Sequence, residues 1–266
     1  MAILRVMSST ANLPDPWAPA VPPSMAELPY DDGEPMESEK HRDQMYLLVE
    51  SLRLHLGEDP SVFVGGNMGI YYTTLQAVKN EFRAPDFFVV LDAQPRAEPR
   101  LSWVVWEEER APDLVIELLS PGTEATDRGR KMTIYARALK VQEYYLFDPH
   151  DLRLEAYVLV DGKYEARPSL PDGSVAADGL GLRLRVAEGR YGNRVDRWLR
   201  WALPDGTLLP TGQELAQAER QRAETERQRA ETERLRADAE RQRAETERLR
   251  ADRLAAKLRA AGIEPE

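Results

Sequence analysis

Apolar residues recur at intervals of three and four positions between residues 38 and 56, which is the spacing of one face of a helix. The apolar positions are Met45, Leu48, Val49, Leu52 and Leu56. Ser38 precedes them, and serine is a residue type that accepts a hydrogen bond from the first turn of a helix. The pattern therefore predicts a helix from Ser38 to about Leu56.

Short apolar runs bounded by turn residues predict the strands of a sheet. The run from Phe87 to Leu91 is continuously apolar, as expected of a strand that is covered on both faces. The other predicted strands are Val62–Val64, Gly69–Tyr72, Trp103–Trp106, Leu114–Leu119, Glu143–Phe147, Leu154–Val160, Gly179–Val186 and Val195–Trp201. Asp161-Gly162 predicts a hairpin turn and Asp205-Gly206 another turn. Residues 127–139 are predicted to form a helix.

From Ala218 onward the sequence repeats in sevens, as AERQRAE, TERQRAE, TERLRAD, AERQRAE and TERLRAD. This repeat predicts one helix of about 45 residues, which would be about 70 Å long. One seam combines alanine or threonine with glutamine or leucine, and only two of its ten positions are leucine. Pairs such as Arg220 with Glu224 would equally support a single solvated helix. The repeat leaves both interpretations open, an isolated charged helix and a loose coiled coil.

These patterns divide the chain into three parts. Residues 1–37 are rich in proline, serine and acidic residues and are expected to form an irregular lead-in. Residues 38–213 are predicted to be the folded domain, and residues 214–262 the heptad-repeat helix or coiled coil.

Composition excludes several kinds of protein. The 266 residues include no cysteine, which excludes disulfides and thiolate metal sites, and the three histidines disfavour a zinc site. No apolar run approaches the roughly 20 residues that span a bilayer. The apolar stretch at the start of the chain is too short for a secretory signal. We expect a soluble, cytoplasmic protein with no membrane partner.

The net charge of −10 argues against broad, non-specific binding of nucleic acid, which requires a basic surface. Between Glu214 and Gly262 there are 13 basic and 11 acidic residues, and Glu264 and Glu266 follow, so the charges of the tail cancel. Residues 1–213 therefore carry the whole net charge of −10. Nucleic acid bound by this part of the chain must meet a local patch or a metal-assisted cleft.

Two acidic residues stand at the ends of apolar, strand-like runs, and a lysine follows in the next predicted helix. They are Asp86, Glu117 and Lys131. Carboxylates in such positions are costly unless they bind a cation or accept strong hydrogen bonds. Two carboxylates and a lysine around one point are also the minimum set for metal-assisted phosphodiester hydrolysis, in which oxygen ligands hold Mg²⁺.

The spacing of the acids indicates which pair can share a cation. Asp113 and Glu117 lie four residues apart on one strand, roughly 13 Å, which is too far for direct sharing. Glu117 therefore needs a partner from another strand, and Asp86 is the best candidate. Asp113 is expected to lie at the strand entrance as a solvated or capping residue.

The lysine comes from the helix that follows Glu117. Lys131 can point at the metal site, with Tyr135 packing beneath it one turn later. Lys131 also forms an ordinary i,i+4 pair with Asp127, so a surface ion pair without chemistry is the alternative.

Segments spread along the chain carry a family resemblance. They are Asp31–Ser38, His41, Val64–Asn67, Ala84–Phe87, Trp106–Glu108, Val115–Thr123, Asp127, Lys131, Tyr135 and Val141–Pro149. From about Gly33 to Thr211 the chain resembles the Uma-type restriction endonuclease family, which belongs to the PD-(D/E)XK nuclease superfamily. Lys140 departs from this family, which usually has glycine before Val-Gln-Glu-Tyr.

The resemblance implies an α/β fold with a restriction-endonuclease-like core, a central mixed sheet flanked by helices, to which the long charged C-terminal helix is added. It implies that Asp86 and Glu117 are the metal-binding acids. The superfamily's usual lysine lies two residues after the second acid, where this chain has Leu119. That departure is consistent with a lysine that has moved to the next helix, as Lys131.

A third acid is also implied by the resemblance. Glu39, on the first helix, resembles an acid that some of these nucleases bring to the site. Glu37 and Glu50 compete with Glu39 for that role.

We therefore expect an enzyme, a Mg²⁺-dependent DNA endonuclease that hydrolyses phosphodiester bonds and accepts Mn²⁺ as a substitute. Asp86 and Glu117 would hold the metal, and Lys131 would orient the attacking water or stabilise charge on the phosphate. The alternative is a catalytically inactive nuclease-like fold that acts as a binding or scaffolding module. In that role the helical tail would join copies of the chain into a homo-oligomer or bind partners.

Overall fold

The computed structural model of the chain describes residues 22–28, 38–79 and 83–260. Of the lead-in expected for residues 1–37, only residues 22–28 are therefore described. The competing acid Glu37 also lies outside the described residues. The chain forms two compact units, Met1–Leu209 and Pro210–Glu266.

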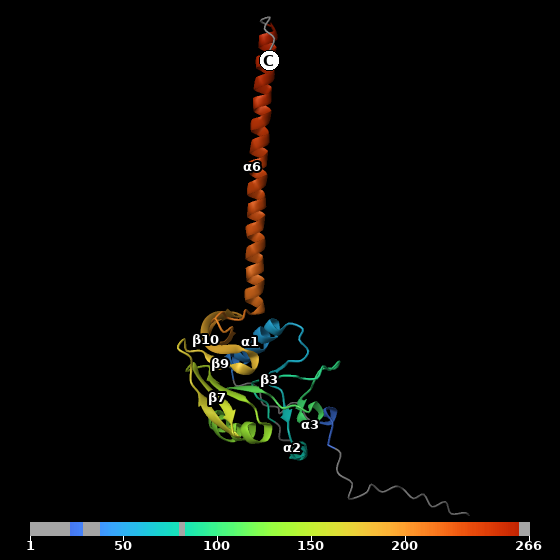
Figure 1. Cartoon of the computed structure of the whole chain (residues 1–266), viewed down its shortest axis with the longest axis vertical. Coiled ribbons are helices and arrows are strands. Elements are labelled where there is room, and N and C mark those ends of the chain that lie inside the picture. The colour runs from blue at the N-terminus through green and yellow to red at the C-terminus, as the bar shows by residue number, and fades with distance from the viewer. Residues whose placement is uncertain (1–21, 29–37, 80–82, 261–266) are drawn as a thin grey trace, which may run out of the picture. The chain divides into compact units, whose positions relative to one another are not determined.

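A six-stranded mixed sheet forms the centre of the first unit (Figure 1). In spatial order its strands are β1 (Phe63–Gly65), β3 (Phe87–Val90), β5 (Leu114–Leu118), β6 (Glu143–Asp148), β7 (Arg153–Val160) and β8 (Lys163–Arg167). β5 and β6 pair in parallel, and the other neighbours pair antiparallel. The expected fold class, a central mixed sheet flanked by helices with a long C-terminal helix, is confirmed.

Both faces of the sheet are buried at β3, β5 and β6, whereas β7 and β8 are largely half-buried or exposed. Side chains alternate between the two faces along each strand. One face carries Phe87, Ile116 and Phe147 and packs against helix α1 (Glu39–Leu56) and a three-stranded antiparallel sheet. The strands of that second sheet are β9 (Val175–Ala177), β10 (Leu182–Tyr191) and β11 (Arg194–Ala202). The opposite face carries Phe88 and Val115 and packs against the helical segment of residues 124–139.

Helix α1 begins and ends where the sequence predicts. The Ser38 hydroxyl accepts a 3.2 Å hydrogen bond from the backbone N–H of His41 and caps the first turn. The helix ends before Gly57, which has a φ of 65° and donates its N–H to the Arg53 carbonyl. The buried side chains Met45, Leu48 and Leu52 belong to the predicted apolar face.

The helical segment of residues 124–139 crosses between β5 and β6, as a parallel strand pair requires. It consists of α4 (Glu124–Thr126), η2 (Asp127–Lys131), α5 (Met132–Ile134) and η3 (Tyr135–Leu139), of which η2 and η3 are π-helical turns. The prediction of a helix over 127–139 is confirmed, although the helix begins three residues earlier. Lys140 ends the segment in the left-handed conformation, with a φ of 55°. That conformation favours glycine, which explains the residue type usual at this position in the resembling family.

Other predicted elements differ from the structure in extent. The predicted strand Trp103–Trp106 is wrong in its second half, because β4 covers only Trp103–Val104 and α3 follows at Val105–Glu108. β4 pairs in parallel with β2 (Ile70–Tyr71). The strand predicted from Gly179 begins only at Leu182, after the turn η4 (Asp178–Leu180). Helix α2 (Thr74–Lys79) and strand β9 were not predicted.

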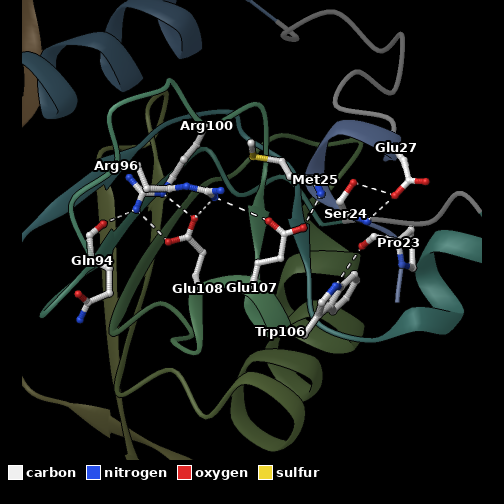
Figure 2. Close-up of polar contacts among 10 residues, drawn as sticks. All are labelled: Pro23, Ser24, Met25, Glu27, Gln94, Arg96, Arg100, Trp106, Glu107 and Glu108. Carbon is white, nitrogen blue, oxygen red and sulfur yellow. Dashed lines mark hydrogen bonds and ion pairs between the residues drawn. The ribbon is translucent and has the colours of Figure 1, made fainter. Parts of the chain in front are cut away.

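Contacts with distant residues hold the α3 region in place (Figure 2). The indole N–H of Trp106 donates to the Pro23 carbonyl at 3.2 Å, and Glu107 accepts a 2.6 Å bond from the backbone N–H of Met25. Met25 lies in η1 (Met25–Glu27). The buried Glu108 pairs with Arg96 and Arg100, each with a nitrogen 2.8 Å from Oε1. The bonds to Pro23 and Met25 attach the α3 region to the segment around η1, and the Glu108 pairs attach it to the loop that carries Arg96 and Arg100.

The second unit contains one long helix, α6, which runs from Gly212 to Ala260. None of its residues is buried. The expectation of one long helix is therefore confirmed, and its apolar seam is uncovered in the chain as described. No helix within the described part of the chain is long and apolar enough to cross a membrane.

Candidate active site

The pairing of β3 with β5 brings the two predicted acids together. In this antiparallel pair Phe87 lies opposite Ile116, and Phe88 lies opposite Val115. Continuing the register by one residue puts Asp86 opposite Glu117. Directly opposed residues on antiparallel strands have Cβ atoms about 5 Å apart and point to the same face. Two acids from distant parts of the sequence thus meet where β3 begins and β5 ends.

Asp86 is fixed by the neighbouring strand. Its Oδ2 accepts a 2.8 Å hydrogen bond from the backbone N–H of Leu118. Burial raises the pKa of Asp86 to about 6, and the Asp127 carboxylate adds to the rise. The Leu118 hydrogen bond and the Lys131 charge oppose the rise in pKa. Asp86 therefore ionises only a little below neutral pH.

Glu117 lies deeper, with 1% of the side chain exposed. The hydroxyl of Tyr135 donates a 2.7 Å hydrogen bond to its Oε1. Burial raises the pKa of Glu117 to about 8; the Lys131 charge opposes the rise, and the carboxylates of Asp86 and Asp127 add to it. A carboxyl in this state holds a proton near neutral pH unless a cation compensates its charge.

The turn after β5 returns the chain to the acids. The Ser120 hydroxyl accepts hydrogen bonds from the backbone N–H groups of Gly122 and Thr123, both at 3.2 Å. The Ser120 carbonyl accepts a 2.9 Å bond from the N–H of Glu124, where the helical segment begins. This short turn carries Lys131 back over the end of the strand.

Lys131 contacts two carboxylates at once. Its ammonium nitrogen lies 3.0 Å from Oε2 of Glu117 and 2.8 Å from Oδ1 of Asp127. Burial opposes the charged form of Lys131, but Glu117 and Asp127 outweigh it and raise the pKa above the usual lysine value. Lys131 is therefore cationic at neutral pH, with 19% of its side chain exposed.

Asp127 is as deeply buried as Glu117, at 1% exposure. The hydroxyl of Tyr144 donates a 3.0 Å bond to its backbone carbonyl and holds the π-helical turn against the sheet. The pair of Lys131 with Asp127 is thus no surface ion pair, because both partners face the acids of the sheet.

Asp113 lies at the strand entrance, as the sequence predicts, and Leu119 is buried. Asp113 accepts a 2.7 Å bond from the backbone N–H of Leu91 at the entrance of β5, four residues before Glu117. Leu119, at the position where the superfamily usually has lysine, is buried in the apolar cluster of the helix-covered face. The cation beside Glu117 comes from Lys131 instead.

Glu39 has different partners. It lies at the start of α1, with 63% of its side chain exposed, and its Oε2 lies 2.9 Å from Arg194. None of the described contacts of Glu39 is with Asp86, Glu117 or Lys131. The competing residue Glu50 lies farther along the same helix. A role for Glu39 stays a prediction.

Two contacts at the site were not predicted from the sequence. The Tyr135 hydroxyl bonds directly to Glu117, whereas the tyrosine was expected only to pack. His41, buried at the start of α1, has its Nε2 3.1 Å from the carbonyl oxygen of Leu119 and its Nδ1 3.0 Å from the Ser38 hydroxyl. The spacing of Tyr135 four residues after Lys131 was a usable signal for the first contact. The second depends on how α1 docks and has no local signal.

The oxygen donors at the site suit a hard divalent cation. Mg²⁺ is usually held by one or two carboxylates, with waters and substrate phosphates as its other ligands. Asp86 and Glu117 supply two such carboxylates, and Glu117 Oε2 accepts no hydrogen bond among the described residues besides its ionic contact with Lys131. Within the described ranges no group of three or more His, Cys, Asp or Glu side chains is arranged to hold a metal. The residues thus fit an ion that keeps water and substrate oxygens as ligands.

A family model and one curated protein are similar to this chain in sequence. A family model described as "Uma2: Putative restriction endonuclease" matches residues 20–187, which is more than half of the chain. An uncharacterized protein of Synechocystis sp. (strain ATCC 27184 / PCC 6803 / Kazusa) is 34% identical over 76 residues, 29% of this chain. The match spans 36% of that relative's own length.

A solved structure is also similar. It is described as a putative nuclease belonging to DUF820 from Anabaena variabilis ATCC 29413. The similarity covers 57% of this chain and 81% of the other chain, with a TM-score of 0.41 and 21% sequence identity.

Proposed function

The chain belongs to the Uma2 family, whose model is described as "Putative restriction endonuclease", and from that premise we propose that it is a Mg²⁺-dependent DNA endonuclease that hydrolyses phosphodiester bonds. One observation carries the proposal: Glu117, buried in an apolar face, meets the Lys131 ammonium at 3.0 Å and stands opposite Asp86. A buried acid and cation of this kind are costly as mere structure, and such strongly perturbed groups gather at catalytic sites.

Asp86 and Glu117 would hold the metal. When bound, Mg²⁺ supplies polarisation of the scissile phosphate and acidification of a water molecule. Leu118 keeps Asp86 aimed at the site through its backbone N–H, and Tyr135 keeps Glu117 aimed there through its hydroxyl.

Lys131 would act on the reacting atoms. Its ammonium would orient the attacking water or stabilise the negative charge that develops on the phosphate. Asp127 lies 2.8 Å from the same ammonium and would keep Lys131 in place while Glu117 turns to the metal. This assigns Asp127 a positioning role.

The proposal is tested by incubating purified full-length protein with supercoiled plasmid and with single-stranded DNA. Cleavage is expected with Mg²⁺ or Mn²⁺, and none with EDTA or in the Asp86→Ala variant. Asp113→Ala, which removes a carboxylate outside the site, serves as the matched control and should still cleave. A wild-type protein that cleaves no DNA with either ion would overturn the proposal.

The exposure of α6 favours a second role, in joining copies of the chain. Four of the five Ala/Thr seam residues, all except Ala218, follow an acidic residue (Glu224, Glu231, Asp238, Glu245). The positions after the Gln/Leu seam residue are all arginine (Arg222, Arg229, Arg236, Arg243, Arg250). Flanking charges set the partner and orientation of a coiled coil. In a parallel, in-register dimer the acidic row of one helix faces the arginine row of the other, so unlike charges meet. In an antiparallel dimer each row faces its own copy, so like charges meet. We therefore propose a parallel homodimer. An inactive core with this tail would be a scaffold.

A further inference from the structure

A groove with a volume of about 700 Å³ opens between α1 and the loop that joins β1 to β2. One wall is the α1 face with Arg42, Tyr46 and Arg53, and the other is the loop of residues 65–68. The openness of this groove to solvent makes it accessible to an extended chain rather than only to a small molecule.

The loop backbone lies directly on the helix at Gly66, because glycine has no side chain. A Cβ added at Gly66 would come within 2.6 Å of the Met45 sulfur and 3.0 Å of Val49. A Cβ added at Gly65 would come within 2.3 Å of the Phe88 ring. Gly66 therefore allows the backbone to approach α1 closely, and Gly65 allows it to approach Phe88 of β3. Met45 and Val49 form an apolar floor of the groove.

The helix wall carries an exposed aromatic ring between two cations. Tyr46 is 51% exposed, although most large apolar side chains of α1 are buried. Arg42 and Arg53 lie one turn before Tyr46 and two turns after it, so all three share one face of the helix. Arg53 is anchored by a 2.6 Å bond from Nη2 to the Val64 carbonyl, and Arg42 contacts Asp43 at 3.4 Å on the surface. The acid on this wall, Glu39, lies 2.9 Å from Arg194 and 4.0 Å from Arg42.

Both walls are attached to the strand ends that carry the acids. The N–H of Asn67, at the tip of the loop, is shared by the carbonyl oxygens of Pro85 and Asp86, both at 3.2 Å. On the helix side, the His41 ring contacts the carbonyl of Leu119, two residues beyond Glu117. The walls of the groove are therefore hydrogen-bonded to the backbone next to the two acids, although the acids themselves are not among the described residues that line the groove.

We propose that this groove binds a single strand of DNA and leads it to the acids, with a base stacked on Tyr46 and phosphates beside Arg42 and Arg53. The inference rests on the proposed endonuclease function and names its substrate as unpaired DNA. Aromatic rings that stack on bases, combined with cations along the backbone, are the general means of binding single strands.

The charge of the chain favours a single strand over a duplex. Residues 1–213 carry a net charge of −10, so the broad basic footprint that holds a duplex through its phosphates is absent from the sequence of this part. A duplex also hides the faces of its bases, which leaves Tyr46 nothing to stack on. Stacking needs only a narrow groove and few cations.

Binding is measured without metal, so that cleavage plays no part. Full-length protein in EDTA is titrated into a fluorescent dT12 oligonucleotide and, separately, into a 12-base-pair duplex, and anisotropy is recorded. Wild-type protein should bind dT12 more tightly than the duplex. Tyr46→Leu should weaken dT12 binding by about tenfold or more, whereas Tyr46→Phe, which keeps the ring, should stay within about twofold.

Matched arginines complete the experiment. Arg42→Ala should weaken dT12 binding and lower its salt dependence, whereas Arg137→Ala, on the exposed side of η3, should leave binding unchanged. Equal binding of dT12 by wild type and Tyr46→Leu would overturn the inference, and so would tighter binding of the duplex. These outcomes are independent of the plasmid assay. Absence of cleavage by the wild type rejects the proposed nuclease function, whereas dT12 binding that does not depend on the Tyr46 ring rejects the proposed binding groove.

Discussion

Lys131 and Glu117 are in direct ionic contact, with the ammonium nitrogen 3.0 Å from Oε2, although they lie on a helix and on a strand. The same ammonium lies 2.8 Å from Asp127. One cation therefore holds two carboxylates that are each 1% exposed. Removal of either partner would leave a buried charge without compensation, which is strongly destabilising unless the remaining group changes its protonation.

Lys131→Met should abolish most of the activity while the chain remains folded. The methionine keeps the length of the stem and removes the charge, and Glu117 can then take up a proton. Cleavage of DNA should fall by about 100-fold or more, as when a group that acts on transition-state charge is lost. The rate is measured on plasmid under saturating Mg²⁺, with Lys163→Met as the control. Cleavage at the wild-type rate by Lys131→Met would reject a catalytic role for this lysine.

The paired acids should form one metal site. Calorimetric titration of the wild-type protein with Mn²⁺ should show a single site that is lost in Glu117→Ala, because a buried carboxylate ligand has disappeared. Asp113→Ala should keep the site, since Asp113 bonds to the Leu91 N–H at the other end of β5. Equal loss of Mn²⁺ binding in both variants would show that the wrong acids have been paired.

Stability without metal should fall as the pH rises. The pKa of Glu117 is raised from 4.5 to about 8, and that of Asp86 from 3.8 to about 6. The folded state therefore binds more protons than the unfolded state between these values, and stability present below pH 4.5 is lost on the way to pH 8. Each group contributes a slope of at most about 1.4 kcal/mol per pH unit.

Thermal unfolding in EDTA from pH 5 to pH 8 measures this effect. Glu117→Gln, which carries no charge at any pH, should flatten the slope. Added Mg²⁺ should stabilise the wild type more at pH 8 than at pH 6, because the ligands must be ionised to bind it. A wild-type melting temperature that falls no more steeply with pH in EDTA than that of Glu117→Gln would contradict the prediction.

Lys140→Gly should stabilise the protein. Lys140 has a φ of 55°, and a left-handed conformation costs an ordinary residue about 1–2 kcal/mol. Glycine removes that strain but adds backbone freedom to the unfolded chain, so the net gain should be about 0.5–1 kcal/mol. Denaturant unfolding of both proteins gives the difference, and DNA cleavage should be unchanged. Lys140→Ala is the control, because it keeps the strain.

Deletion of residues 214–266 should leave the first unit folded. The helix α6 has no buried residues, and stability comes mainly from buried apolar surface. The melting temperature should change little, while sedimentation should report the loss of the proposed parallel dimer. If the truncated protein is insoluble or unfolded, the tail is part of the fold of the first unit and the prediction is wrong.

The strands of the core could be predicted because their apolar runs are long and bounded by turns. Phe87–Val90 and Leu114–Leu118 are buried at every position, as a strand covered on both faces must be. The face of each residue then follows from alternation, which is why Glu117 could be separated from Asp113 and paired with Asp86. The exact register of β3 and β5 required the structure.

The predictions that were wrong concern segments whose structure depends on contacts with residues distant in the sequence. Trp106 fits a strand by residue type, but bonds from Trp106 to Pro23 and from Glu108 to Arg96 and Arg100 hold this segment as a helix. The sequence predicted that Lys131 points at the site and left an ordinary i,i+4 pair with Asp127 as the alternative. The structure shows both contacts, and the distance from Lys131 to Glu117 depends on the turn at Ser120.

The heptad repeat of α6 sets the length of the tail in units of seven residues, and recombination between repeats can add or remove such units. Each repeat of seven residues adds about 10.5 Å and turns the seam by only about 20°. Because none of the helix is buried, the gain or loss of a whole repeat disturbs no core contact. Insertion of three or four residues would instead move the seam to another side. Related genes should therefore vary in tail length by whole multiples of seven codons.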